Sequence, residues 1–208
     1  MRAVDLSGFG AWVSDVATTM VVASPERAQD HDRVVRTALD HETPLPARFG
    51  QVVAAESELR AAVWERRAAF EAALDRIDGS VEMTVRMLVP SGTRTQPGGD
   101  ATKAEGEASG RAYLERVAAA QREERNVLAK AGIIRERVSS AVGPLVRAES
   151  FASAGAGSSL VTLSHLVPRE HIDAYRRALL TLRQEDPALA IMVSGPWAPY
   201  SFTEGIGA

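Results

Sequence analysis

Histidine is the side chain in this sequence best suited to bind a metal or to act as a base near neutral pH, and it occurs four times. His31 lies in Asp30-His31-Asp32, and because adjacent helical positions point apart, we expect solvated polar surface there and no metal site. His165 alternates with apolar residues of a strand, so we expect a partly buried histidine with a hydrogen-bond partner. No two histidines have the i, i+4 spacing of a helical metal site. We therefore predict no metal.

Other catalytic groups are also poorly represented. The chain has no cysteine, which excludes disulfides, thiolate catalysis, iron–sulfur clusters and cysteine zinc sites. The Gly- and Ser-rich run 154–159 resembles a phosphate-binding loop only in composition, because it leads into a strand and no Lys follows it. We predict neither a cofactor nor an enzymatic activity.

Composition restricts the partners. The chain has 208 residues, 25% of them charged, and a net charge of −3, so nothing indicates a nucleic-acid partner. Its four later strands contain one aromatic, Phe151, too few for an RNA-stacking surface. No apolar stretch approaches the ~20 residues of a membrane span, and no signal peptide is visible. We expect a cytoplasmic protein.

The first part of the chain predicts a small α/β domain over residues 1–78. Two short strands flank the turn at 7–10, and a helix capped by Ser24 begins at Pro25 and ends before Pro44. Residues 45–53 read as a bent extended segment. A second helix, with Ser57 as a candidate cap, runs to Ile77 and is ended by Gly79. The start is abrupt, so we expect an opening strand to be missing.

Residues 79–208 predict a second domain. Val81, Met83, Val85 and Met87 alternate with Glu82, Thr84 and Arg86, which indicates a strand with its polar residues in solvent. A flexible polar loop (90–107), a helix (106–142), strands (146–152 and 159–167), a helix (169–185) and a strand (189–195) follow. This βαββαβ order is that of a ferredoxin-like antiparallel sheet with both helices on one face. The expected fold class is thus α+β, with two small α/β domains.

The helix at 106–142 carries a heptad seam that runs from Tyr113 to Ala141 and spans ~50 Å. A small sheet cannot cover that length. We expect part of the seam to pack on the helix at 59–77, as a helical hairpin. An intermolecular coiled coil is the alternative.

Four segments lack a simple structural explanation: Leu45-Pro-Ala-Arg-Phe-Gly50, Gly79-Ser-Val-Glu82, Gly110-Arg-Ala-Tyr-Leu114, and the tail Gly195-Pro-Trp-Ala-Pro-Tyr-Ser-Phe202. In this order they resemble the GvpF/GvpL family of gas vesicle accessory proteins, with its LPxRFG, GxVE, GxxYL and GPWxPYSF segments. Gln51 and Ala198 depart from the residues common in that family, and its aromatic-rich opening strand is not found.

The resemblance implies a non-enzymatic assembly factor and minor component of gas vesicles. Such a protein would bind the hydrophobic shell protein or other accessory proteins, limit aggregation and help nucleate vesicles. Arg48, Phe49, Trp197, Tyr200 and Phe202 are the candidate residues. They would either contact a partner or clamp the domains and pack the tail. The alternative is a ferredoxin-like small-molecule enzyme or sensor.

Overall fold

The computed structural model describes residues 1–17, 20–89, 107–153 and 160–203. The chain is of the α+β class and divides into two compact units. Unit 1 comprises Met1–Glu82 and the segment from Pro196 onward, and unit 2 comprises Met83–Gly195. The tail, predicted to belong to the second domain, groups with the first 82 residues in the structure. Of the predicted loop at 90–107, all but Glu107 falls outside the described residues, as does the run at 154–159.

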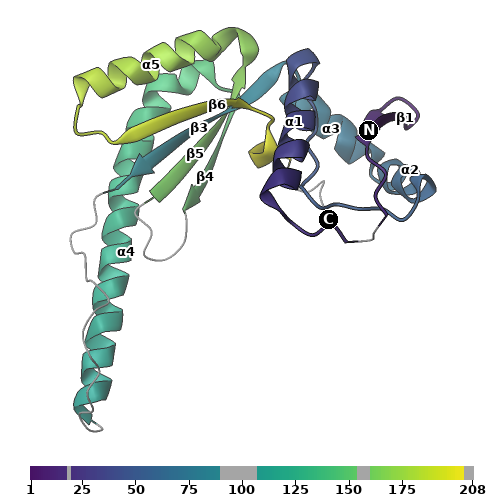
Figure 1. The fold of residues 1–208 in the computed structure, drawn as a ribbon. Helices are drawn as coiled ribbons and strands as arrows, with labels where there is room; N and C mark the ends of the chain where they lie inside the picture. The colour runs from purple at the N-terminus through teal and green to yellow at the C-terminus, as the bar shows by residue number, and fades with distance from the viewer. Residues whose placement is uncertain (18–19, 90–106, 154–159, 204–208) are drawn as a thin grey trace. The chain divides into compact units, whose positions relative to one another are not determined.

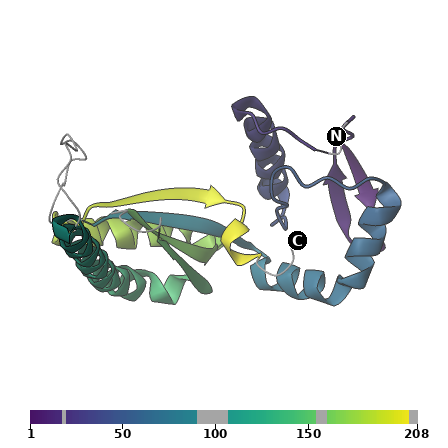
Figure 2. The same cartoon turned by 90° about the horizontal axis from the view of Figure 1, so that it is seen from below.

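Unit 1 begins with a β-hairpin, as predicted. Strands β1 (Arg2–Asp5) and β2 (Gly10–Val13) pair antiparallel, and the turn between them places Ser7 and Gly8 at positive φ (Figure 2). Because a lone hairpin is marginal in water, it needs a packing partner. That partner is helix α2, whose Val63 forms a buried cluster with Val4 and Leu6.

The first helix, α1 (Pro25–His41), is confirmed, and the Ser24 side chain accepts a hydrogen bond from the Arg27 backbone N–H at 3.3 Å. The single helix expected from Ser57 to Ile77 is wrong. It is broken into α2 (Glu56–Glu65) and α3 (Arg67–Ile77), and α2 has Ala55 at its N-cap. The break at Arg66 turns the chain next to Arg67, whose side chain holds the hairpin turn 60 residues earlier.

The larger sheet has the order β4-β5-β3-β6, with strands β3 (Ser80–Leu88), β4 (Ala148–Ser153), β5 (Leu160–Pro168) and β6 (Ile191–Trp197). β4 pairs antiparallel with β5. The helices of unit 2, α4 (Glu107–Val142) and α5 (Ile172–Glu185), lie on one side of this sheet (Figure 2). Short 3₁₀ turns occupy Gly143–Leu145, Arg169–His171 and Tyr200–Phe202.

Strand β3 contradicts one prediction. Its apolar face is buried as expected, with Val81, Met83 and Val85 at 0% exposure. Two of the three residues assigned to solvent are buried as well, Glu82 at 7% and Thr84 at 8%, whereas Arg86 is exposed. Glu82 is buried because the C-terminal segment, 119 residues later in the chain, covers it.

Helix α4 is only partly covered. Val127, Ala131 and Val138 of its seam are buried, and the helix that packs on it in unit 2 is α5. Tyr113 and Leu114, in contrast, are 59% and 66% exposed. The N-terminal part of α4 extends past the sheet (Figure 1). Within unit 2 the buried part of the seam packs on α5, whereas the predicted partner helix at 59–77 belongs to unit 1.

Candidate functional site

A buried carboxylate of unit 1, that of Glu82, binds the C-terminal segment. Both carboxylate oxygens of Glu82 accept hydrogen bonds from Ser201: Oε2 from the backbone N–H at 2.9 Å and Oε1 from the hydroxyl at 2.8 Å. Charge-assisted bonds of this kind are the stronger class. A buried carboxylate with both oxygens occupied is suited to hold a segment of chain in place.

Two arginines also hold this segment. Arg76, in the last turn of α3, donates a hydrogen bond to the carbonyl oxygen of Phe202. The guanidinium of Arg36 lies 4.7 Å from the ring centroid of Trp197, within the range of a cation–π contact. The Phe202 side chain is buried at 8% exposure. The tail is thus attached at several points along its length.

His31 joins the tail to the bent segment after α1. Its Nε2 lies 3.1 Å from the carbonyl oxygen of Ala47 and 3.2 Å from the hydroxyl of Tyr200. Because a carbonyl can only accept, Nε2 carries the hydrogen and donates to this oxygen. The ring also meets Phe49 edge-on, with centroids 5.7 Å apart. The expectation that His31 is simply solvated surface is therefore wrong.

We call this set the tail cluster. It comprises His31, Arg36, Ala47, Phe49, Arg76, Glu82, Trp197, Tyr200, Ser201 and Phe202. It contains four of the five predicted site residues and three of the four sequence segments noted above. The fourth segment, around Tyr113, lies at the start of α4.

Arg48 is the exception among the predicted residues. It is exposed, and its guanidinium forms no hydrogen bond or ion pair with the described part of the chain. Its two neighbours, Ala47 and Phe49, are both held by His31. Arg48 is thus a cation presented to solvent from a fixed piece of backbone.

Sequence reasoning missed His31, Arg36, Arg76, Glu82 and Ser201. Glu82 and Ser201 lie inside two of the noted segments, at positions that the GxVE and GPWxPYSF motifs specify, and this was an available signal. No comparable signal marks the other three, because surface histidines and arginines are common on helices.

For Tyr200, burial and then the charge of Asp32 raise the pKa of the hydroxyl, which keeps it protonated.

Unit 2 contains a second polar network around His165. This residue is fully buried, with Nδ1 2.7 Å from the Tyr175 hydroxyl and Nε2 3.2 Å from Oε2 of Glu149. Glu149 also accepts hydrogen bonds from Ser139 and, at 2.6 Å, from Arg135. Burial opposes its charge, but these donors together hold the pKa of Glu149 below its usual range. The expected hydrogen-bonded histidine is present and is more deeply buried than predicted.

Within the described ranges, no group of three or more His, Asp or Glu side chains is arranged to hold a metal ion. None of the helices described is both long and apolar enough to span a membrane.

The chain matches known gas vesicle proteins over nearly its whole length. The family model described as gas vesicle synthesis protein GvpL/GvpF matches residues 1–204. Gas vesicle protein F1 of Halobacterium salinarum is 28% identical over 97% of this chain and 80% of its own length. Gas vesicle protein L of a Streptomyces species is 28% identical over 85% of this chain and 68% of its own length.

Solved structures agree in fold. The crystal structure of GvpF from Anabaena sp. PCC7120 superposes with a TM-score of 0.74 at 20% identity, covering 98% of this chain and 85% of that one. GvpF from Microcystis aeruginosa gives 0.75 at 16% identity, with 98% and 88% covered. With the family model matched across residues 1–204, this chain belongs to the GvpL/GvpF family of gas vesicle synthesis proteins.

Proposed function

We propose that this protein is an assembly factor and minor component of gas vesicles that binds the hydrophobic shell protein, other accessory proteins or both. In this role it limits aggregation and helps nucleate vesicles, at the gas vesicle and in the cytoplasm. The observation that carries the proposal is the family match across residues 1–204. That membership implies a role in gas vesicle formation, and the binding role is the step we add.

The physical need for such a factor follows from the partner's chemistry. A subunit that exposes apolar surface or unpaired strand edges before assembly aggregates unless a partner covers them. This protein exposes several large apolar side chains on its described surface, including Trp64 at 68%, Leu88 at 57% and Met192 at 56%. Exposed apolar surface of this kind supports a binding role.

We assign the partner contact to Arg48 and a positioning role to Phe49, Trp197, Tyr200 and Phe202. The tail cluster fixes the backbone on both sides of Arg48, whereas the guanidinium itself is exposed. Arginine is enriched at the energetic centres of protein interfaces. A preorganised, exposed arginine loses less side-chain entropy on binding than one on a mobile loop.

We further propose that β3, α4, β4, β5, α5 and β6 form a ferredoxin-like domain beginning at residue 79, with residues 1–78 as the other domain. The strand order β4-β5-β3-β6 and the placement of both helices on one side support this proposal.

An Arg48→Ala variant should capture about tenfold less shell protein or accessory protein in a pull-down, because about 1.4 kcal/mol of contact energy is lost. The melting temperature should not change, since the Arg48 guanidinium forms no hydrogen bond or ion pair with any residue that the structure describes. Arg33→Ala is the matched control, because the side chain of this arginine of the same unit is 74% exposed and pairs at the surface with Asp30.

Expression of a gas vesicle cluster with each variant completes the test. Undiminished capture by Arg48→Ala would contradict the partner contact assigned to Arg48, and only that part of the proposal. If the unaltered protein captured no gas vesicle protein, directly or through others, the proposed function itself would be wrong.

A further inference from the structure

Unit 1 has a hollow between the hairpin turn and helix α2. Leu6 and Phe9 line it from the hairpin, Val63 and Trp64 line it from the helix, and Arg60 and Arg67 also belong to the lining. Its volume is about 300 Å³, at the lower end of the range for ligand pockets. The space suits one or two apolar side chains better than a cofactor.

The hairpin wall of this hollow is fixed from both ends. At the turn, Nη1 of Arg67 donates a hydrogen bond to the carbonyl oxygen of Ser7 at 2.7 Å, and its guanidinium lies 5.0 Å from the centroid of the Phe9 ring. Beneath the hollow, Leu6 and Val63 are buried at 6% and 8% exposure.

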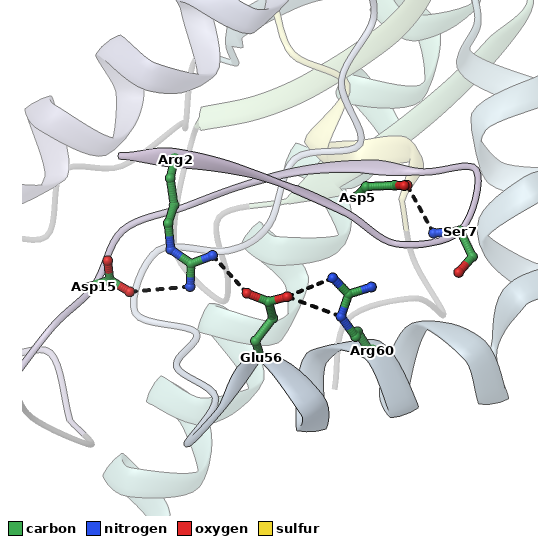
Figure 3. A network of polar contacts seen from close by, with 6 residues as sticks. All are labelled: Arg2, Asp5, Ser7, Asp15, Glu56 and Arg60. Carbon is green, nitrogen blue, oxygen red and sulfur yellow. Dashed lines mark hydrogen bonds and ion pairs between the residues drawn. The ribbon is translucent and has the colours of Figure 1, made fainter.

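Figure 3 shows how the other end is held: Arg2 of β1 and Arg60 of α2 bind the same carboxylate of Glu56. The distances are 2.8 Å from Arg2 and 2.6 Å from Arg60. A hollow with fixed walls exists before a partner arrives, which lowers the entropic cost of binding.

The lining of the hollow combines residue types that are typical of the energetic centre of a protein interface. Trp64 is 68% exposed, although a tryptophan there gains far more from burial than a smaller residue would. Tryptophan and arginine are the residues most enriched at such centres, and here they adjoin one another.

The charged residues that line the hollow are all positive. The lining includes two arginines and no acidic residue. Each guanidinium has a carboxylate partner outside the hollow, Glu56 for Arg60 and Glu71 for Arg67. Because a guanidinium has five N–H donors, both can accept a second carboxylate at the edge.

We propose that this hollow is a docking site for a segment of another protein that inserts an apolar side chain against Trp64 and places a carboxylate on Arg60 or Arg67. The partner segment is therefore both apolar and acidic. The site does not involve Arg48 or the tail cluster, and it stands whether or not the shell protein is the partner.

The test is selection of a phage-displayed library of random 12-residue peptides on the full-length protein. Enriched peptides should combine Leu, Ile, Phe or Trp with Asp or Glu, and a synthetic copy should bind with a Kd of about 10–100 μM. A Trp64→Ala variant should weaken this binding at least about tenfold. Trp12→Ala is the matched control, because Trp12 is 45% exposed on β2 and lies outside the lining.

An Ala61→Trp variant, which fills the hollow from its own lining, gives a second reading and should also abolish binding. Several outcomes would overturn the proposal. These are enrichment of basic peptides, no enrichment at all, equal loss in Trp64→Ala and Trp12→Ala, and self-association of the protein that only Trp64→Ala removes.

Discussion

A Glu82→Ala variant should release the C-terminal segment from unit 1. It removes two hydrogen bonds to a buried carboxylate, and each bond to a charged group contributes about 1.5–3 kcal/mol. Allowing for partial compensation by Arg76 and Arg36, we expect the docked tail to lose about 3 kcal/mol. This corresponds to a roughly hundredfold rise in the population of the open state. Proteolysis after Tyr200 or Phe202 under native conditions would measure this rise.

Two further variants make this prediction specific. Glu82→Gln keeps one oxygen acceptor and should cost about half as much, and Ser201→Ala removes only the hydroxyl bond. In a double-mutant cycle, Glu82→Ala and Ser201→Ala should be non-additive, because they remove the same interaction. Cleavage of Glu82→Ala at the wild-type rate would show that the other contacts hold the tail alone.

The loss should extend to Arg48. When Tyr200 leaves, His31 loses one of the groups that fix its ring, and the backbone around Arg48 is held less firmly. We therefore expect Glu82→Ala to weaken partner capture as well, although Glu82 is 7% exposed and cannot itself reach a partner.

Local sequence patterns were sufficient to predict most of the helices and strands. The hairpin, α1 with its Ser24 cap, β3 and α5 follow from alternation, capping residues and helical spacing, all of which act within a few residues. Long-range contacts were not accessible in the same way. Glu82 occupies a solvent position by strand alternation, but a segment 119 residues later covers it.

The errors in helices have a similar cause. Neither glycine nor proline marks the break at Arg66, where the next residue, Arg67, contacts the distant hairpin turn. On α4, the heptad seam led us to expect packing on the helix at 59–77, because apolar spacing indicates that a helix can pack but not what packs on it. The structure covers the seam from Val127 onward.

The resemblance noted in the sequence was more informative about the site than any residue type. Three of the noted segments meet in the tail cluster, although at least 28 residues separate them along the chain. Packing of the aromatic tail was one of the two roles expected for its residues, and Phe202 is buried. Its role in binding a partner stays a prediction.

Unit 2 should lose stability as the pH falls below neutral, through His165. Burial is the largest influence on this residue and lowers its pKa below the usual 6.5, against the opposing effect of Glu149. The folded state therefore binds its proton less readily than the unfolded chain, so stability is fully present above pH 6.5. It declines as the pH falls from there through the lowered pKa. The slope is at most about 1.4 kcal/mol per pH unit for one proton.

The geometry explains why protonation is costly. With neutral His165, Nε2–H donates to Glu149 and Nδ1 accepts from the Tyr175 hydroxyl, so all three groups are satisfied. Burial raises the pKa of Tyr175, so its hydroxyl remains a donor. A second proton on the ring would place Nδ1–H against the Tyr175 hydroxyl, which is itself a donor. The positive charge of Arg135 also makes the site less favourable for a cation.

In urea unfolding of the full chain, the free energy of unfolding should therefore be lower by about 1 kcal/mol at pH 5.5 than at pH 7.5. A His165→Asn variant should be less stable overall and should lose much of this dependence, whereas His171→Asn, also in unit 2, should keep it. Glu149→Gln should cost about 2 kcal/mol, since Arg135 is half exposed and its pair is partly screened. An unchanged pH profile in His165→Asn would assign the dependence to another group and would show that the buried imidazole does not control it.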